Sequence, residues 1–255
     1  MKKLLLAFVV LSMMLGAPSG AQTTELLVHD GDTFTFVIKT LDVSNSQDTS
    51  SSGLTISEES GTGSITLNEG DTFTVKIVSA TPVKDSGEVY LLTEYTAHGV
   101  TIQQHDYIDF GGFIVYPDWD GYKSDLTSSG LTSSTSDTDY SNSYKITIID
   151  TASEFGYIQD STYSYSYGDT SSTSSNHNEI RYSKADGVVN YISFTGSSTD
   201  VSSGTTTKDN GKIQIVRQGY NIPNTGPALP LPAYQFLWII PAMIAIGVIR
   251  RRIYN

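Results

Sequence analysis

Residues 33–38 and 72–78 alternate between polar and apolar side chains, and several other segments keep the same period of two. This pattern is typical of β-strands with one buried face. The other predicted strands are 54–56, 88–96, 100–108, 113–116, 144–149, 155–158, 162–167, 179–183, 188–194 and 212–216. One short helix is expected at 118–126. We therefore expect a mainly β fold, an antiparallel β-sandwich or a curved half-barrel sheet with at most one short helix.

Turn residues and a repeat refine this pattern. His98-Gly99 lies between two predicted strands and indicates a β-hairpin. The phrase Gly-Asp-Thr-Phe-Thr occurs at 31–35 and again at 70–74, which predicts two similarly placed strands of one sheet or a duplicated hairpin. Ser and Thr dominate residues 124–142, where we expect a mobile loop. A second Ser/Thr-rich stretch, 197–207, is expected to separate the last two strands.

The N-terminal segment has the features of an export signal. Lys2 and Lys3 precede an apolar run at 4–15, and small residues follow at 19–21. We predict a signal peptide at 1–21 that is cleaved after Ala21. An uncleaved N-terminal anchor or a buried helix is the competing interpretation.

The C-terminal segment has the features of a membrane anchor. Residues 233–249 are almost all apolar and lead directly into Arg250, Arg251 and Arg252. We predict a β domain at 22–219 outside the cell, a Pro-rich linker at 220–232, a transmembrane helix at 233–249 and a cytoplasmic tail at 250–255. A C-terminal core helix of a soluble domain is the alternative.

Two family resemblances concern this tail. The pentapeptide Ile222-Pro223-Asn224-Thr225-Gly226 resembles a sortase sorting signal, although Leu is usual where Ile222 stands. That resemblance implies cleavage between Thr225 and Gly226 and transfer of Thr225 to the cell wall. Residues 231–252 also resemble the endings of archaeal surface proteins, in which Pro and a small or aromatic residue precede a short span and a basic cluster. The archaeal interpretation is favoured, and both imply display on the outside of a cell.

A further resemblance concerns the middle of the chain. Gly31-Asp32-Thr33-Phe34-Thr35-Phe36, the segment 113–120 and the segment 181–191 follow one another in this order. The order is similar to that of an exported β domain in archaeal anchored surface proteins, particularly those of the Asgard group. The resemblance covers about residues 25–218 and implies a β fold and a surface location. It supplies no catalytic residues.

The net charge of the chain limits the classes of molecule that the protein could bind. Five of the fifteen basic residues lie in the two terminal segments, so the remainder carries a net charge of about −17. This charge opposes binding to nucleic acid or anionic lipid, and it favours solubility and weak cation binding. The chain has no cysteine, so disulfides cannot stabilise the exported domain.

Acidic residues suggest one candidate site. Asp118 and Asp120 stand in Asp118-Trp119-Asp120-Gly121, and Asp125 follows. Carboxylates on a flexible loop are suitable Ca²⁺ ligands, so calcium is the one cofactor that these residues suggest. The segment resembles the start of an EF-hand loop but lacks its third early ligand and its closing Glu. A solvated turn and helix cap is the competing interpretation, and a glycosidase carboxylate pair is a third.

Aromatic residues suggest a second candidate site. In a strand, Tyr163, Tyr165 and Tyr167 point to one face, and together with Trp119 they could stack on sugars. A strand face that packs on the core would show the same alternation.

These features favour a non-enzymatic, surface-anchored domain for adhesion, ligand binding or envelope structure. Its partners would be the membrane, through the C-terminal helix, and a surface glycan or protein. One alternative is a surface-tethered glycosidase- or peptidase-like hydrolase that uses Asp118 and Asp120. Another alternative is a substrate-binding subunit of an envelope complex. The sequence contains no Gly-x-Ser-x-Gly motif of a serine hydrolase.

Overall fold

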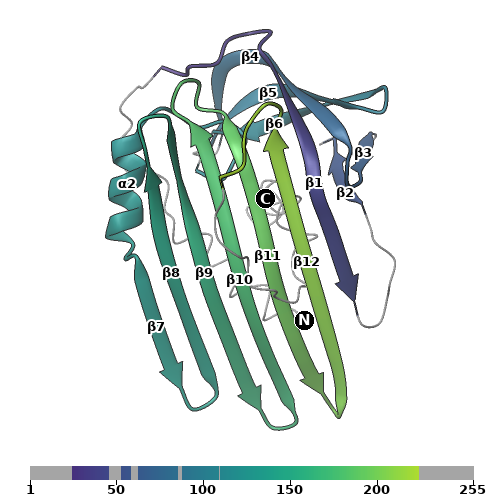
Figure 1. The fold of residues 1–255 in the computed structure, drawn as a ribbon, viewed down its shortest axis with the longest axis vertical. Helices are drawn as coiled ribbons and strands as arrows, with labels where there is room; N and C mark the ends of the chain where they lie inside the picture. The colour runs from purple at the N-terminus through teal and green to yellow at the C-terminus, as the bar shows by residue number, and fades with distance from the viewer. Residues whose placement is uncertain (1–24, 46–52, 59–62, 86–87, 109, 224–255) are drawn as a thin grey trace.

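The computed structural model describes residues 25–45, 53–58, 63–85, 88–108 and 110–223 (Figure 1). Within them the chain forms twelve strands and one helix. The elements are β1 (Thr33–Asn45), β2 (Leu54–Ser57), β3 (Ser64–Leu67), β4 (Thr72–Asp85), β5 (Glu88–Ala97), β6 (Val100–Tyr107), α2 (Trp119–Ser128), β7 (Thr132–Asp137), β8 (Tyr140–Asp150), β9 (Glu154–Tyr167), β10 (Thr170–Ser183), β11 (Val189–Ser202) and β12 (Thr205–Arg217). The predicted mainly β fold with one short helix is confirmed.

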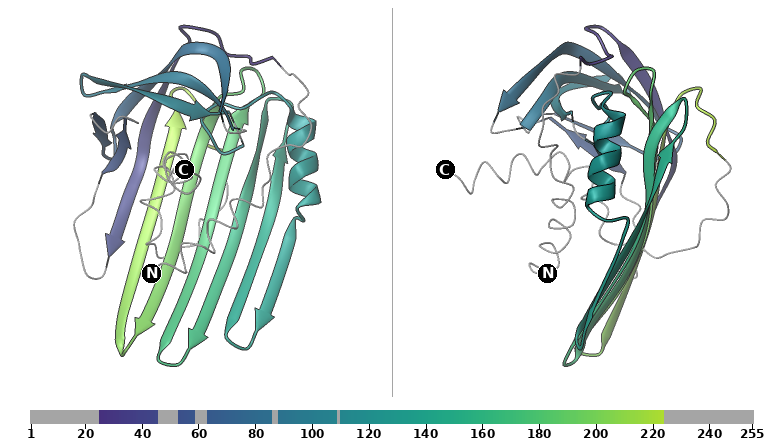
Figure 2. Two further views of the ribbon diagram at one scale, coloured as in Figure 1. Left: turned by 180° about the vertical axis from the view of Figure 1, so that it is seen from behind. Right: turned by 90° about the vertical axis from the view of Figure 1, so that its left-hand side faces the viewer.

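One large sheet contains ten of these strands in the order β6-β5-β4-β1-β12-β11-β10-β9-β8-β7, and β2 and β3 form a separate hairpin. All strand pairs are antiparallel. Seen edge-on, the sheet curls over where β4, β5 and β6 lie, whereas the lower halves of β7–β12 run nearly straight (Figure 2). The sheet therefore has a concave face, which also carries α2, and a convex face.

The hydrophobic core fills the concave side of the curled half. The Phe36 ring lies 5.4 Å from Phe73 and 5.1 Å from Phe113. A second group forms under α2, where Phe110 stacks at 4.8 Å on Tyr122 and lies 5.6 Å from Phe155. Of these rings, Phe36, Phe73 and Phe155 are fully buried, whereas Phe110 and Phe113 are partly buried. Large buried rings supply much of the apolar burial that stabilises a domain without disulfides.

The repeated phrase forms equivalent turns at the starts of two neighbouring strands. Asp32 accepts a hydrogen bond from the His29 amide at 2.8 Å, and Asp71 accepts one from the Asn68 amide at 2.7 Å. Each turn is completed by a glycine with a φ of +89°. The strands that follow, β1 and β4, pair with each other so that Phe36 stands opposite Phe73. The prediction of two similarly placed strands in one sheet is confirmed.

The predicted hairpin at His98-Gly99 is also confirmed. Both residues have positive φ, 53° and 76°, as a two-residue type I′ connection requires. The strands β5 and β6 pair without a register shift, from Ala97 opposite Val100 to Tyr90 opposite Tyr107.

Both Ser/Thr-rich segments were wrongly predicted to lie outside the strands. Residues 124–142 contain the end of α2, all of β7 and the start of β8, and residues 197–207 contain the end of β11, the start of β12 and the turn between them. Hydrophobic alternation is missing there because neither face of the sheet is covered by a hydrophobic core. Neighbouring strands nevertheless satisfy the backbone, and side chains bridge strands, as in the 2.7 Å contact between the hydroxyls of Ser143 and Thr162.

Two smaller differences from the prediction concern where strands start and stop. The segment 113–116 makes only a single bridge, between Ile114 and Val188, and is not a strand. The segments 155–158 and 162–167 belong to one continuous strand, β9. In both cases the apolar pattern marks buried residues correctly but does not show where ladder pairing starts or stops.

The chain enters and leaves the described domain at the same end of the sheet. The first residues of β1 and the last residues of β12 lie at the top in Figure 1, and the β7–β8, β9–β10 and β11–β12 turns lie at the opposite end. The predicted signal peptide, transmembrane helix and basic tail lie outside the described residues. Among the residues that are described, no helix has the length and apolar character needed to cross a membrane.

Candidate functional site

The predicted acidic site forms the start of α2. Asp118 is the N-cap residue, and its carboxylate accepts a hydrogen bond from the Gly121 amide at 3.1 Å. Asp120 lies in the first turn, where a negative charge interacts favourably with the helix dipole. Asp125 lies further along the helix, and its backbone carbonyl accepts a hydrogen bond from the Ser129 amide. The geometry thus gives Asp118 a capping role.

No group of three or more His, Cys, Asp or Glu residues that could hold a metal is found in the described ranges. A calcium site at Asp118, Asp120 and Asp125 therefore stays a prediction.

The fourth member of the predicted ligand-binding set, Trp119, lies apart from the tyrosines. It packs against the core, 5.6 Å from the Phe155 ring.

The three predicted tyrosines do lie on one face of β9. They continue the line of Phe155 and Tyr157 on the concave face, but they lie beyond the hydrophobic core. Tyr163 and Tyr165 are partly exposed, and Tyr167 at the hairpin end is 70% exposed. Tyr140 of β8 stands opposite Tyr165 and makes an edge-on ring contact with Tyr163 at 5.5 Å.

Polar side chains continue these tyrosine rows across the neighbouring strands. In one row Tyr165 stands opposite Ser172, which stands opposite Asp200. The adjacent row crosses the same strands and includes β12; its members are Tyr163, Ser174, Ser198 and Asp209. One half of this surface is therefore aromatic, and the other half presents hydroxyls and carboxylates. We refer to Tyr140, Tyr163, Tyr165, Ser174 and Asp200, which are all partly exposed, as the tyrosine platform.

Asp209 borders the platform in an unusual environment. It is 3% exposed, and its Oδ1 atom has no hydrogen-bond partner in the described part of the chain. Burial, together with the negative charge of Asp200, raises the pKa of Asp209 to about 7. Asp200 itself accepts a hydrogen bond from the Ser198 hydroxyl at 3.2 Å.

Stability is expected to fall with rising pH because of Asp209. Its pKa lies above the ordinary value of 3.8, so the folded state binds more protons than the unfolded state between pH 3.8 and about 7. The stabilisation that protonated Asp209 contributes is fully present below pH 3.8 and is lost above about pH 7. Between these values the free energy of unfolding falls by at most about 1.4 kcal/mol per pH unit. Urea unfolding at several pH values would measure the slope. Asp209→Asn should remove this part of the slope, whereas Asp169→Asn at the exposed β9–β10 turn should not; equal slopes in all three proteins would contradict the assignment.

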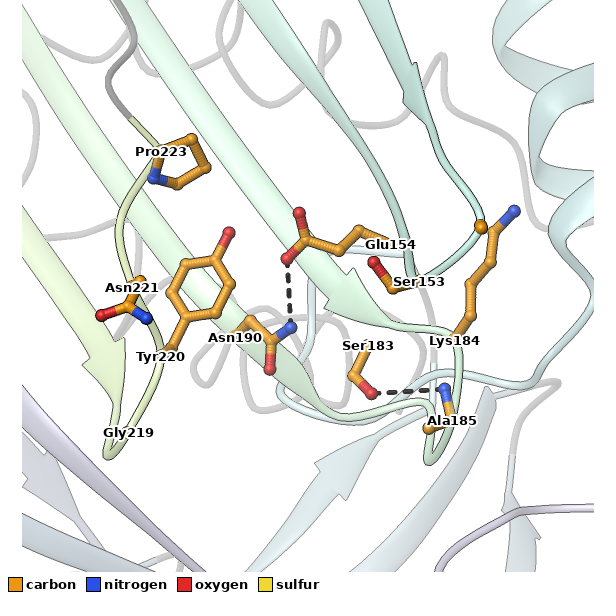
Figure 3. Close-up of a pocket in the computed structure, with 11 residues that line it drawn as sticks. Ser153, Glu154, Ser183, Lys184, Ala185, Asn190, Gly219, Tyr220, Asn221 and Pro223 are labelled. Atoms are coloured by element: carbon orange, nitrogen blue, oxygen red, sulfur yellow. Dashed lines mark hydrogen bonds between the residues drawn. The ribbon is translucent and has the colours of Figure 1, made fainter.

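A separate polar pocket lies on the convex face, where residues 218–223 cross the sheet (Figure 3). It is open to solvent and has a volume of about 740 Å³. Glu154 and Asn190 lie on its floor, Lys184 lies on one side, and Tyr220 and Pro223 lie on the other. The Asn190 amide donates to the Glu154 carboxylate at 3.2 Å.

Beneath this pocket, two carboxylates share one guanidinium. Arg181 donates from Nε to Glu179 at 2.6 Å and from Nη1 to Glu154 at 3.4 Å. The side chains of Arg181 and Glu179 are only 9% and 2% exposed. Burial alone would lower the pKa of Arg181, but the hydrogen bond and charge of Glu179 more than offset this effect and raise it. The triad is a buried ionic network whose members depend on one another.

Tyr220 brings the C-terminal segment onto this network. Its ring lies 6.4 Å from that of Tyr191, and its hydroxyl is buried near the Glu154 carboxylate. Burial, reinforced by the nearby Glu154 carboxylate, raises the pKa of Tyr220 well above its usual range. Because Arg181 binds both carboxylates, the pocket offers polar binding groups and not a free acid–base pair.

Sequence reasoning missed this pocket. Glu179 and Arg181 are two residues apart, which places opposite charges on one face of a strand, and that signal was available. The positions of Glu154 and Tyr220 depend on the register of β9 against β10 and on the path of the chain after β12, which no local pattern gives. Of the predicted sorting pentapeptide, Pro223 lines the pocket and Ile222 is 40% exposed, while Asn224, Thr225 and Gly226 lie outside the described residues.

No protein-family model, no curated protein and no solved structure matches this chain.

Proposed function

We propose that this protein is a surface-displayed, non-enzymatic binding domain that takes a glycan on its tyrosine platform. The observation that carries the proposal is the shared register of aromatic and hydrogen-bonding residues. The Tyr163 and Tyr165 rings lie in the same rows as Ser174 and Asp200, on a straight part of the sheet beyond the hydrophobic core.

The chemistry of the platform is suited to sugars. A sugar ring has apolar C–H faces, which stack on aromatic rings, and a rim of hydroxyls, which hydrogen bond to carboxylates and hydroxyls. The platform provides both kinds of group over several strands, so it fits an extended oligosaccharide better than a small compact ligand. Its acidic side chains oppose binding of nucleic acid or of anionic lipid.

The proposal that the domain is displayed on the cell surface depends on the two terminal segments. A cleaved signal peptide at 1–21 and an anchor at 233–249 would leave the domain outside the cell, held by the Pro-rich linker. Mass mapping of the mature protein tests this. We expect a chain that starts at Gln22 and ends at Asn255. A chain that ends at Thr225 with an added mass would instead support sortase-type transfer, and a chain that keeps residues 1–21 would contradict cleavage.

Tyr165→Ala is expected to weaken glycan binding about tenfold, which corresponds to roughly 1.4 kcal/mol, while the protein stays folded. The ring is partly exposed and lies outside the hydrophobic core, so its loss removes a stacking surface and little packing. Binding of the full chain to an array of neutral and N-acetylated oligosaccharides would identify the ligand, and titration calorimetry would give the change in affinity.

Ser164→Ala is the matched control, because Ser164 is the next residue of β9 and faces the convex side. It should leave glycan binding unchanged. If no oligosaccharide bound the full chain, or if both variants bound as tightly as the original protein, the platform would not be the glycan site. If Tyr165→Ala unfolded the protein, the ring would belong to the core.

A further inference from the structure

The outermost strand of the straight half of the sheet, β7, has an open edge. β7 is the last strand in the sheet order, and all six of its residues, Thr132–Asp137, are exposed. In Figure 1 it forms the margin of the lower half, while α2 lies beyond its start. β7 pairs with β8, and β8 with β9, without a register shift. The edge also lacks the Pro, Lys or bulge with which proteins usually prevent further strand pairing.

Alternate backbone groups of β7 point outward. The Leu131 carbonyl accepts a hydrogen bond from the Ile146 amide at 2.7 Å, which places Leu131, Ser133 and Thr135 on the side that bonds to β8. By strand alternation, Thr132, Ser134 and Ser136 turn their N–H and C=O groups away from β8. Among the residues that the structure describes, no segment pairs with this outer side.

We propose that β7 pairs with β7 of a second copy of this chain to form an antiparallel, two-fold symmetric dimer. Only a two-fold axis perpendicular to the sheet extends it with antiparallel strands and keeps the convex faces on one side. With that symmetry, a residue whose N–H and C=O groups point away from β8 must stand opposite a residue of the second copy whose groups also point away from β8. A centre at Ser134 places Ser134 opposite its own copy and Thr132 opposite Ser136, so all three outward-facing residues find partners.

The charges along β7 permit this pairing despite the acidic character of the protein. Asp137 is the only charged residue in the strand. In the register centred on Ser134 it stands opposite Leu131 of the second copy, so no two carboxylates face each other. Leu131 itself is 38% exposed, although it is apolar, and its position beside the turn of the second copy would reduce that exposure.

The other edge of the sheet is a poor partner for β7. β6 belongs to the curled half, and β4, two strands inward, changes register twice against β5. A straight edge pairs well with a second straight edge, so the pairing closes after two copies and does not continue as a filament. The chain's own C-terminal segment is no substitute, because Pro223, Pro227, Pro230 and Pro232 lack the N–H groups that a continuous ladder needs.

The dimer would join two tyrosine platforms into one surface. Because the axis is perpendicular to the sheet, both platforms face the same side and could bind one polymer at two places. Linked sites of this kind raise apparent affinity without new contacts. The dimer itself does not rest on the proposed glycan binding.

Sedimentation equilibrium of the full chain in detergent would test the proposal. We expect a monomer–dimer equilibrium, and we expect Ser134→Pro to weaken association at least tenfold. Proline removes an N–H that points away from β8, and it is tolerated at sheet edges. Ser134→Lys should weaken association similarly, because two ammonium groups would then face each other. Circular dichroism would confirm that both variants are folded.

Disulfide trapping provides an independent measurement, because the natural chain has no cysteine. Directly opposite residues of a hydrogen-bonded pair lie about 5.5 Å apart at Cα, within the range that a disulfide spans. Ser134→Cys should give a crosslinked dimer under mild oxidation, whereas Thr173→Cys, exposed in the middle of the same face, should not. A full chain that stays monomeric at high concentration, or a dimer that neither Ser134 variant weakens, would overturn the proposal. A monomer that binds a strand from a different protein at β7 would overturn it too.

Discussion

Replacing Arg181 by alanine is expected to lower the free energy of unfolding by about 3–5 kcal/mol. Arg181 is the only cation that contacts Glu179, whose side chain is 2% exposed, in the described part of the chain. Without the guanidinium, Glu179 must either remain buried as an uncompensated charge or bind a proton, and both options destabilise the fold. Urea unfolding monitored by circular dichroism would measure the loss.

Two comparisons separate this effect from ordinary surface electrostatics. Lys123 forms an exposed 2.6 Å ion pair with Asp150, and Lys123→Ala should hardly change the unfolding midpoint. Replacing Arg181 and Glu179 together by Met and Leu should recover much of the stability, because neither of the two most buried charges is then left unpaired. Glu154, which is 14% exposed, keeps its hydrogen bond from the Asn190 amide. If Arg181→Ala were as stable as Lys123→Ala, the buried network would not contribute to folding.

A second large effect is expected at Asp106, which lies under the curled half of the sheet. Its Oδ2 accepts hydrogen bonds from the Thr93 hydroxyl and the Tyr95 hydroxyl, both at 2.6 Å. Thr93 and Tyr95 are at most 1% exposed. Asp106→Ala would leave the Tyr95 hydroxyl without its acceptor, and the Thr93 hydroxyl would keep only its longer 3.3 Å bond to the Gln104 carbonyl. The expected loss of unfolding free energy is at least about 1–3 kcal/mol, the cost of one unsatisfied buried group.

A double-mutant cycle tests whether these groups act together. Tyr95→Phe removes one donor, so its cost should be much smaller in the Asp106→Ala background than in the natural protein. Asp120→Ala, in the first turn of α2, serves as the control and should change stability far less. Additive costs for Asp106→Ala and Tyr95→Phe would show that the 2.6 Å contact between them does not stabilise the fold.

The elements that could be predicted from the sequence are those that local chemistry determines. His98 and Gly99 form the turn between β5 and β6 because adjacent residues that accept positive φ favour one hairpin connection. Asp118 lies at the start of α2 because its side chain can cap the first turn. The strands that contain Phe36 and Phe73 were recognised because one of their faces packs on the core.

The polar strands could not be recognised in this way. Ser172 and Thr173 show no contrast between an apolar and a polar face, since the strand is held there by its neighbours and not by a core. The pocket at Glu154 escaped prediction for a similar reason. Glu154 and Arg181 meet across β9 and β10, and a shift of one residue in that register would place them on opposite faces.

The β7–β8, β9–β10 and β11–β12 turns lie at the opposite end of the sheet from the start of β1 and the end of β12, and this has a consequence for how such a protein can change during evolution. Each turn closes a pair of neighbouring strands that leave the hydrophobic core well before the turn. Two residues could be added to or deleted from every strand of the straight half at these turns, and each remaining side chain would keep its face because the strand repeat is two. The core, the turns at Asp32 and Asp71 and both connections to the rest of the chain would be untouched. The straight half is therefore a region of adjustable length, and related proteins could differ in reach while they keep one folding unit.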